Sequence, residues 1–329
     1  MARIFVVGSG SWGTAMTVSL ASVGNHVCLW SLEKEVTEAL KKDGENKKLL
    51  PGVKIVGDVD YTSDDSKCAE YKIIVFATPS HTIRSVSQRF AKYINKKQII
   101  VCISKGFDEE KHLRLTEVIK EEIPDATVVA MSGPSHAEEV SRGLPTTNVV
   151  AGNNKEAVQL VQDTFNTPNF RIYTSDDVIG VELGGALKNV IALAAGICDG
   201  LGYGDNTKAA LITRGIAEIT RLGIAMGAKP ETFAGLSGIG DLIVTCTSMH
   251  SRNRRAGILI GKGKTPDEAA REVNMVVEGI KTAKAVYYLS KKYGVEMPIS
   301  SEVYNVVFEG RDVNECAAAL MGRSLKSEN

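Results

Sequence analysis

The sequence lacks the features that mark exported, metal-binding or membrane-spanning proteins. Its six cysteines are scattered without a CxxC pair, so we expect reduced, mostly buried thiols and a cytoplasmic protein rather than a disulfide framework. Its five histidines show neither ligand spacing nor an HExxH motif, and no metal site is predicted. The first apolar run is too brief for a signal peptide, and no uncharged apolar run is long enough to span a membrane.

An excess of one charge is also missing. The 39 basic side chains balance the 39 acidic ones, and this balance gives no indication of nucleic acid or an anionic membrane as a partner. A local cluster of basic residues could still bind a phosphate group. A chain of 329 residues is long for a single compact core, so we expect two domains.

Short apolar segments alternate with helical patterns in the first half of the chain. These segments are rich in β-branched residues and end in Gly, Pro or Ser; they read RIFVVG, HVCLW, KIIVFATP, QIIVCISKG and TVVAMSGP. Such a pattern predicts a parallel sheet that binds ligands at the carboxyl ends of its strands. After about Tyr173 the strand signals stop. The helices predicted there are Val178–Ile197, Thr207–Met226, Pro230–Phe233, Ser251–Leu259, Pro266–Val273, Lys281–Tyr293 and Ser300–Phe308. We therefore predict an α/β protein, with an N-terminal Rossmann-type parallel-sheet domain at residues 1–175 and an all-helical C-terminal domain at 176–329.

A glycine-rich turn follows the first predicted strand. The segment GSGSWG places Gly8, Gly10 and Gly13 in a GxGxxG pattern that opens a predicted helix. Glycines permit a tight turn and a close approach of the backbone, and the helix N-terminus offers N–H groups to a pyrophosphate. The pattern alone is weak evidence, but its position between a strand and a helix predicts a dinucleotide site.

Glu33 follows the second predicted strand, twenty residues after the last glycine of the motif. An acidic side chain at this position would accept hydrogen bonds from an adenosine ribose and repel a 2′-phosphate. A solvated glutamate at the start of a helix explains the same residue.

Lys188 interrupts the apolar run VELGGALKNVIALAAG, directly after Gly184 and Gly185. On a helix the two glycines lie beside the lysine and leave its face nearly bare. Glycine weakens a helix, and a desolvated lysine is costly unless it is paired. The combination suggests a functional site, while a lysine that reaches solvent past small packing residues remains the alternative.

Further candidates lie in loops that would face a ligand. Lys105 follows a predicted strand, and Gly133–Pro134–Ser135 leads into a helix; a solvated lysine and a structural turn are the competing interpretations. In the helical half, Asp241 follows a glycine-rich turn and precedes Ser251–Arg252–Asn253. Arginine and asparagine suit a phosphate group, although a basic helix start on the surface would show the same letters.

Several of these segments together resemble the bacterial NAD(P)-dependent glycerol-3-phosphate dehydrogenase family. The similarity runs from Ile4 to about Met321 in matching order, through GSGSWGTA, SKG, SGPSHAEEV, VELGGALKNVIALAAGICDGLGYGDNTKAALITRG, GLSGIGDLIVTCTSMHSRN and MVVEG. The resemblance implies a Rossmann domain followed by a helical domain. It also implies reduction of dihydroxyacetone phosphate to sn-glycerol 3-phosphate with NADH or NADPH, which supplies phospholipid synthesis.

The resemblance also implies roles for individual residues. Lys188 matches the proton acceptor. Matches to cofactor contacts are Ser11, Trp12, Lys105, Ala137, Arg252, Val276 and Glu278. They add to Gly8, Gly10, Gly13 and Glu33, which the glycine motif and the end of the second strand predict. Matches to substrate contacts are Lys105, Gly133, Ser135, Lys188, Asp241, Ser251, Arg252 and Asn253.

The chain departs from many relatives after the second strand. They carry a basic residue there, whereas this chain has Leu32–Glu33 followed by Lys34; the use of NAD or NADP is therefore expected without a preference for NADP. The implied partner is a phosphorylated small molecule, and the sequence leaves open whether the chain forms a homodimer. Competing interpretations are another two-domain hydroxyacid or hydroxyacyl dehydrogenase and a non-catalytic dinucleotide sensor.

Overall fold

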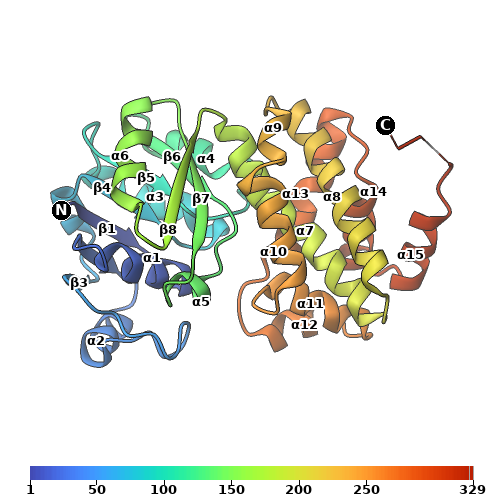
Figure 1. The fold of residues 1–329 in the computed structure, drawn as a ribbon, viewed down its shortest axis with the longest axis horizontal. Coiled ribbons are helices and arrows are strands. Elements are labelled where there is room, and N and C mark those ends of the chain that lie inside the picture. Colours follow the sequence, from blue (N-terminus) through green and yellow to red (C-terminus); the bar gives the residue numbers. More distant parts are fainter. Residues whose placement is uncertain (326, 329) are drawn as a thin grey trace. The chain divides into compact units, whose positions relative to one another are not determined.

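The computed structural model describes residues 1–325 and 327–328. The chain forms two compact units (Figure 1). The sheet unit comprises Met1–Gly185 and Ala228–Asp241, and the helical unit comprises Ala186–Gly227 and Leu242–Asn329. The last strand ends at Ser175, next to the predicted boundary, but part of the following helix and a later segment belong to the sheet unit. A division into separately folding domains at residue 175 stays a prediction.

The sheet has eight strands in the order β3-β2-β1-β4-β5-β6-β7-β8. All neighbouring strands are parallel except β6 and β7, which are antiparallel. The strands are β1 (Arg3–Val7), β2 (His26–Trp30), β3 (Val59–Thr62), β4 (Ile73–Phe76), β5 (Ile99–Cys102), β6 (Thr127–Ser132), β7 (Thr146–Ala151) and β8 (Phe170–Ser175). The five central strands match the predicted ones, and the fold class is confirmed.

Strands β3, β7 and β8 were not predicted, and β7 breaks the expectation of a wholly parallel sheet. The edge strands β3 and β8 carry polar residues because one side is exposed, as in VDYT and FRIYTS. Short strands with a polar face lack the continuous apolar pattern that identified the buried strands.

Each face of the sheet is covered by helices because both sets of alternating side chains are apolar. On one face, strand residues pack with Met16 and Leu20 of α1 (Ser11–Ala21) and Val161 of α6 (Lys155–Phe165). On the other, Phe90 of α3 (Ile83–Phe90) and Ile119 of α4 (Leu115–Glu122) cover the strands (Figure 1). The unit also contains α2 (Lys34–Asp43), α5 (Ala137–Val140) and α9 (Pro230–Phe233).

A smaller apolar cluster covers the β6–β7 end of the sheet. Ala130, Val149 and Ala151 project from the strands and pack with Val181 and Leu236. Val181 belongs to the first turns of α7 (Val178–Gly200), and Leu236 to a π-helical turn at Leu236–Gly240. Two segments beyond the last strand therefore complete this face of the sheet.

The outer edge of β8 is closed by polar side chains. Gln162 of α6 donates to the carbonyl oxygen of Ile172 at 2.9 Å, and the Ile172 N–H donates to Asn166 at 3.3 Å. The Phe170 N–H donates to Thr167 Oγ1 at 2.9 Å. Satisfied backbone groups at an edge strand oppose pairing with another chain.

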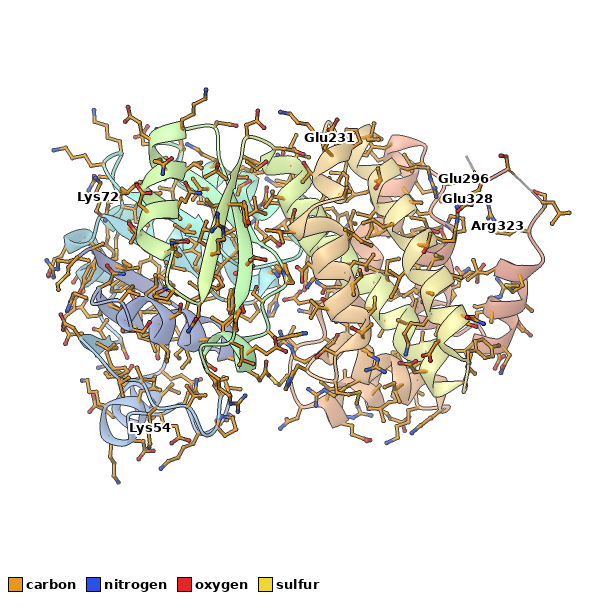
Figure 2. The ribbon with its side chains drawn as sticks, viewed as in Figure 1. Lys54, Lys72, Glu231, Glu296, Arg323 and Glu328 are labelled. Atoms are coloured by element: carbon orange, nitrogen blue, oxygen red, sulfur yellow. The ribbon has the colours of Figure 1, made fainter. Side chains whose placement is uncertain are left out.

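The helical unit contains most of α7 with α8 (Asp205–Ala225), α10 (Asp241–Thr247, of which Asp241 belongs to the sheet unit), α11 (Arg252–Gly261), α12 (Pro266–Val273), α13 (Glu278–Tyr293), α14 (Pro298–Phe308) and α15 (Val313–Met321). The described helix α7 is long and apolar enough to cross a membrane, but 83% of its most apolar window is buried. It therefore serves as a core helix. Charged residues lie on the outside, where Arg323 pairs with Glu296 at 3.2 Å (Figure 2).

Helices α7 and α11 cross with their backbones in contact. Each helix has two glycines four residues apart, Gly196 and Gly200 on α7 and Gly257 and Gly261 on α11. A Cβ atom on Gly257 would overlap the carbonyl oxygen of Leu193 and lie 2.8 Å from the Cα of Gly196. Small residues at this spacing permit the close approach of two helices. The crossing fixes α11 on the helix that carries Lys188.

A buried carboxylate holds the start of α14. Glu218 of α8 accepts hydrogen bonds from the Ile299 N–H at 2.6 Å, the Ser300 N–H at 3.2 Å and the Ser300 hydroxyl at 3.1 Å. Burial raises the pKa of the Glu218 carboxyl, while these donors lower it in part.

Candidate active site

The glycine motif forms an open turn at the start of α1. Gly8 has φ +112°, and a Cβ atom on Gly13 would overlap the carbonyl oxygen of Gly8, so both positions require glycine. At Gly10, no described atom outside its chain neighbours lies within 4 Å of the place where a Cβ would stand. Gly10 is the N-cap of α1, and no described side chain caps the helix there. The turn thus leaves both space and N–H groups for a pyrophosphate, as a bound dinucleotide requires.

Side chains that the sequence analysis did not identify support this turn. Asn46 donates to the carbonyl oxygen of Ser9 at 2.8 Å and to Thr14 Oγ1 at 2.9 Å, and the hydroxyl of Ser31 donates to Ser9 Oγ at 2.7 Å. Asn46 lies outside the motif, so only the fold identifies it. These bonds hold the loop in the shape that a cofactor would meet.

Two predicted cofactor residues come together beside this turn. Ala137 begins α5 and packs in a small apolar cluster with Ala15 of α1, and Trp12 packs against the same cluster.

The structure places Glu33 as the exposed N-cap of α2, just beyond β2. It stands where the sequence analysis expects a ribose-binding carboxylate.

Four predicted substrate residues meet above the sheet. The ammonium group of Lys105 donates to Asp241 Oδ2 at 2.7 Å and to the carbonyl oxygen of Gly133 at 2.9 Å. The hydroxyl of Ser135 donates to the same carbonyl oxygen at 3.0 Å. The Asp241 side chain is only 1% exposed and that of Lys105 18% exposed. The geometry is that of a held cation, unlike a lysine extended into solvent.

The glycine pair on α7 has a packing role. A Cβ atom on Gly184 would overlap the carbonyl oxygen of Ser237, and one on Gly185 would overlap the hydroxyl of Ser132. The Gly185 position also lies 3.5 Å from Lys105 Cδ. The two glycines therefore let the first turns of α7 pack closely against the backbone at Ser237 and the side chain of Lys105.

A buried ion pair fixes the same turns of α7. Glu182 accepts from Arg114 Nη1 at 2.5 Å, from the Thr116 N–H at 2.9 Å and from the Thr116 hydroxyl at 2.6 Å. Burial raises the pKa of the Glu182 carboxyl, and Arg114 opposes that rise. The Glu182 carboxylate has hydrogen bonds to Arg114 and Thr116, and these bonds fix the orientation of the first turns of α7.

Lys188 lies one turn beyond the glycines on α7. Its side chain is buried, with 6% exposure, and its ammonium group donates to Thr245 Oγ1 of α10 at 2.7 Å. A lysine that snorkels would expose its charged end. Thr245 lies in the quoted segment LIVTCTSMHSRN, but nothing in its spacing separates it from the other hydroxyl residues there.

Asn253 joins three helices at this end of the helical unit. Its amide donates to Asn189 Oδ1 of α7 at 2.9 Å and accepts from the Gly279 N–H of α13 at 2.8 Å. These bonds bring the Val276–Glu278 segment to the start of α11. Asn189, the neighbour of Lys188, was not identified from the sequence.

Ser251 and Arg252 begin α11. Ser251 is the buried N-cap and accepts from the Arg254 N–H at 3.2 Å, and Arg252 is the first helical residue. A helix N-terminus with an adjacent guanidinium is a suitable place for a phosphate. The predicted residues of the helical unit, Lys188, Ser251, Arg252, Asn253, Val276 and Glu278, therefore lie on segments that the Asn189–Asn253–Gly279 bonds connect.

Two sequence families match this chain, one to each half of a known enzyme. Residues 3–158 match the NAD-dependent glycerol-3-phosphate dehydrogenase N-terminus, and residues 177–318 match the C-terminus of the same enzyme. The chain belongs to the NAD-dependent glycerol-3-phosphate dehydrogenase family.

Relatives of this family member cover its whole length. It is 51% identical to glycerol-3-phosphate dehydrogenase, NAD(P)+, of Desulfitobacterium hafniense over 328 residues, which is 100% of this chain and 93% of the relative. The Fusobacterium nucleatum protein of the same name is 53% identical over 331 residues, covering 100% and 99%. The crystal structure of glycerol-3-phosphate dehydrogenase from Coxiella burnetii superposes with a TM-score of 0.94, at 36% identity, covering 98% and 99% of the two chains.

Proposed function

We propose that this family member catalyses the reversible reduction of dihydroxyacetone phosphate to sn-glycerol 3-phosphate with NADH or NADPH, in the cytoplasm. The observation that carries the assignment of chemistry is the buried ammonium of Lys188, held 2.7 Å from Thr245 Oγ1 on a largely apolar helix. This arrangement supports Lys188 as the proton donor, because the hydrogen bond to Thr245 holds its ammonium group in one position.

A dinucleotide held at the glycine turn would supply the hydride for reduction of the substrate's C2 carbonyl. Lys188, as ammonium, donates a proton to the oxygen at C2 as negative charge develops there. In the reverse reaction the neutral amine accepts the hydroxyl proton. Thr245 orients the amine, which limits the geometries from which the proton is transferred.

Arg252, with Ser251 and Asn253, binds the substrate phosphate at the start of α11. A phosphate lies away from the reacting carbon, so its binding orients the substrate rather than stabilising the new alkoxide. Lys105, Gly133, Ser135 and Asp241 contribute further substrate contacts, and the pairing of Lys105 with Asp241 fixes the lysine for this purpose.

The cofactor residues are the glycine motif with Ser11 and Trp12, together with Glu33, Lys105, Ala137, Arg252, Val276 and Glu278. The open position at Gly10 and the uncapped start of α1 among the described residues support the pyrophosphate contact. We further infer that Glu33 binds the adenosine ribose and makes NADH at least as good a substrate as NADPH.

The test is a direct assay. Purified protein mixed with dihydroxyacetone phosphate and NADH or NADPH should oxidise the reduced nicotinamide, which is followed as a loss of absorbance. The reverse reaction should start with sn-glycerol 3-phosphate. The proposal would be contradicted if NADH or NADPH were oxidised with a 2-keto acid or a 3-ketoacyl thioester as substrate, but not with dihydroxyacetone phosphate.

A further inference from the structure

The segment between α10 and α11 is held by a side chain that has no assigned role in the reaction. Arg254 of α11 donates from Nη1 to the carbonyl oxygen of Thr247 at 2.7 Å and to the sulfur of Met249 at 3.2 Å. The Arg254 N–H donates to the N-cap hydroxyl of Ser251. One residue thus contacts both ends of the segment that leads into Arg252.

Asp199 fixes the guanidinium of Arg254. Arg254 Nε donates to Asp199 Oδ2 at 2.7 Å, and Lys208 of α8 donates to Asp199 Oδ1 at 2.7 Å. All three side chains are between 13% and 18% exposed. Double pairing in a partly enclosed place defines the direction of the guanidinium more strictly than one exposed ion pair does.

The position of Asp199 is itself unfavourable for the helix. It lies in the last turn of α7, where a carboxylate opposes the helix dipole. Two cations compensate for this cost, and both come from other helices. Asp199 and Lys208 both lie in the segment CDGLGYGDNTKAALITRG, which has no role in the proposed chemistry. Together with Arg254 they connect α7, α8 and α11.

We propose that Arg254, fixed by Asp199, is a positioning residue that aligns Ser251 and Arg252 for the phosphate of the substrate. The backbone contact between α7 and α11 fixes where α11 lies along α7. The Asp199–Arg254 pair fixes the conformation of the loop that precedes α11. In this role Arg254 acts through Ser251 and Arg252 rather than through its own contact with the substrate. The inference rests on the proposed function, because it assumes that Arg252 binds the phosphate.

The test compares dihydroxyacetone phosphate with dihydroxyacetone, which lacks the phosphate. For the wild type and each variant, the ratio of kcat/KM for the two ketones measures how well the phosphate is used. Arg254→Ala should lower this ratio about tenfold, mainly through a higher KM for the phosphorylated ketone, as expected when a coupled contact is lost. Activity on dihydroxyacetone and the Kd for NADH should change little.

Asp199→Ala should have a similar effect, and the double variant should be no worse than either single one, because both changes break the same link. Arg254→Lys should give an intermediate ratio, since an amine cannot reach Asp199 and the Thr247 carbonyl together. Arg323→Ala, which breaks an ion pair elsewhere in the helical unit, is the control and should leave the ratio unchanged. If Arg254→Ala does not fold, Arg254→Lys decides.

Equal losses for both ketones would show a merely structural role and overturn the inference, as would an unchanged ratio. Arg252→Ala separates this result from a failure of the proposed function. It should lower the ratio by about 10–100-fold, as expected for a lost charge-assisted contact. If Arg252→Ala leaves the ratio unchanged, the phosphate assignment is wrong. If only the Arg254 variants leave it unchanged, the positioning role alone is wrong.

Discussion

Lys188 is a buried cation whose ammonium group has a hydroxyl partner, which makes it unlike an ordinary surface lysine. We expect Lys188→Met to lower kcat by about a hundredfold or more, the usual contribution of general acid–base catalysis. Methionine fills a similar space, so the fold and the Kd for NADH should be retained. Turnover and thermal melting measured on the same variant provide the check.

The contrary result is also informative. Near-normal turnover together with a lower Tm would mean that Lys188 only supports packing. In that case Lys105, whose ammonium group is paired with the Asp241 carboxylate, would be the next candidate for the base. Lys264→Met, at an exposed lysine that pairs with Glu272 in the same unit, should leave turnover nearly unchanged and is the control.

Glu33 decides the cofactor prediction at the residue scale. Its carboxylate at the N-cap of α2 would repel a 2′-phosphate, so kcat/KM with NADH should equal or exceed that with NADPH. Glu33→Arg should shift the ratio toward NADPH by roughly tenfold, since an arginine there pairs with the extra phosphate. A large advantage for NADPH in the wild type would contradict the prediction and direct attention to Lys34.

At this scale the sequence predicted the chemical groups better than their partners. Lys188, Lys105 and Asp241 stood out because a charge among apolar or glycine-rich neighbours is unusual. Thr245, Asn189 and Asn46 did not, because hydroxyl and amide residues are common everywhere and only the fold shows which one meets a charge. The glycines at 184 and 185 were expected to leave the helix face beside Lys188 bare, whereas the structure shows them packed against Ser237 and Ser132.

Helices α7 and α11 depend on glycine at their crossing. In Gly257→Ala the new methyl group would overlap the Leu193 carbonyl, which is backbone and cannot rotate away. We expect a loss of about 1–3 kcal/mol in the free energy of unfolding, as overpacking usually causes. Denaturant unfolding measures it. Gly204→Ala is the control and should change stability far less, because outside its chain neighbours no described atom would lie within 4 Å of the new methyl group.

The thermal stability of the protein should depend on pH through Glu218, the carboxyl that holds the start of α14. Because the folded-state pKa of Glu218 is raised, folding favours its protonated form, and its contribution to stability falls as pH rises from the unfolded pKa through the folded one. Glu218→Gln removes this dependence. The wild type should therefore exceed the variant in Tm by more near pH 5 than near pH 8. A larger difference near pH 8 would mean that the folded-state pKa is lowered.

Among the elements, continuous apolar runs and clear helix starts decided what the sequence predicted. The helices Pro230–Phe233 and Pro266–Val273 match their predicted bounds because each begins at a proline. Helices α10 and α15 were not predicted, and neither were β3, β7 and β8. Strands β3 and β8 lie at the edges of the sheet, and β7 opens with the polar residues Thr146–Asn148, so polar residues interrupt the apolar pattern in all three strands.

For the whole molecule, the sequence predicted the class of fold but not how the chain is shared between its parts. Helix α7 begins in the sheet unit and continues into the helical unit, and Ala228–Asp241 returns to the sheet unit. Such returns depend on contacts between distant segments, such as Val181 and Leu236 with Val149. No local pattern in the sequence specifies them.

This exchange of segments has a consequence for the order in which the protein acquires its structure during synthesis. The strands are complete once Ser175 has been added, yet the patch formed by Ala130, Val149 and Ala151 still lacks its cover. Leu236 arrives only after the ribosome has also made Ala186–Gly227. At about 5–20 residues per second, the nascent sheet would expose apolar surface for several seconds. The first half of the chain is thus most prone to aggregate before the second half is made.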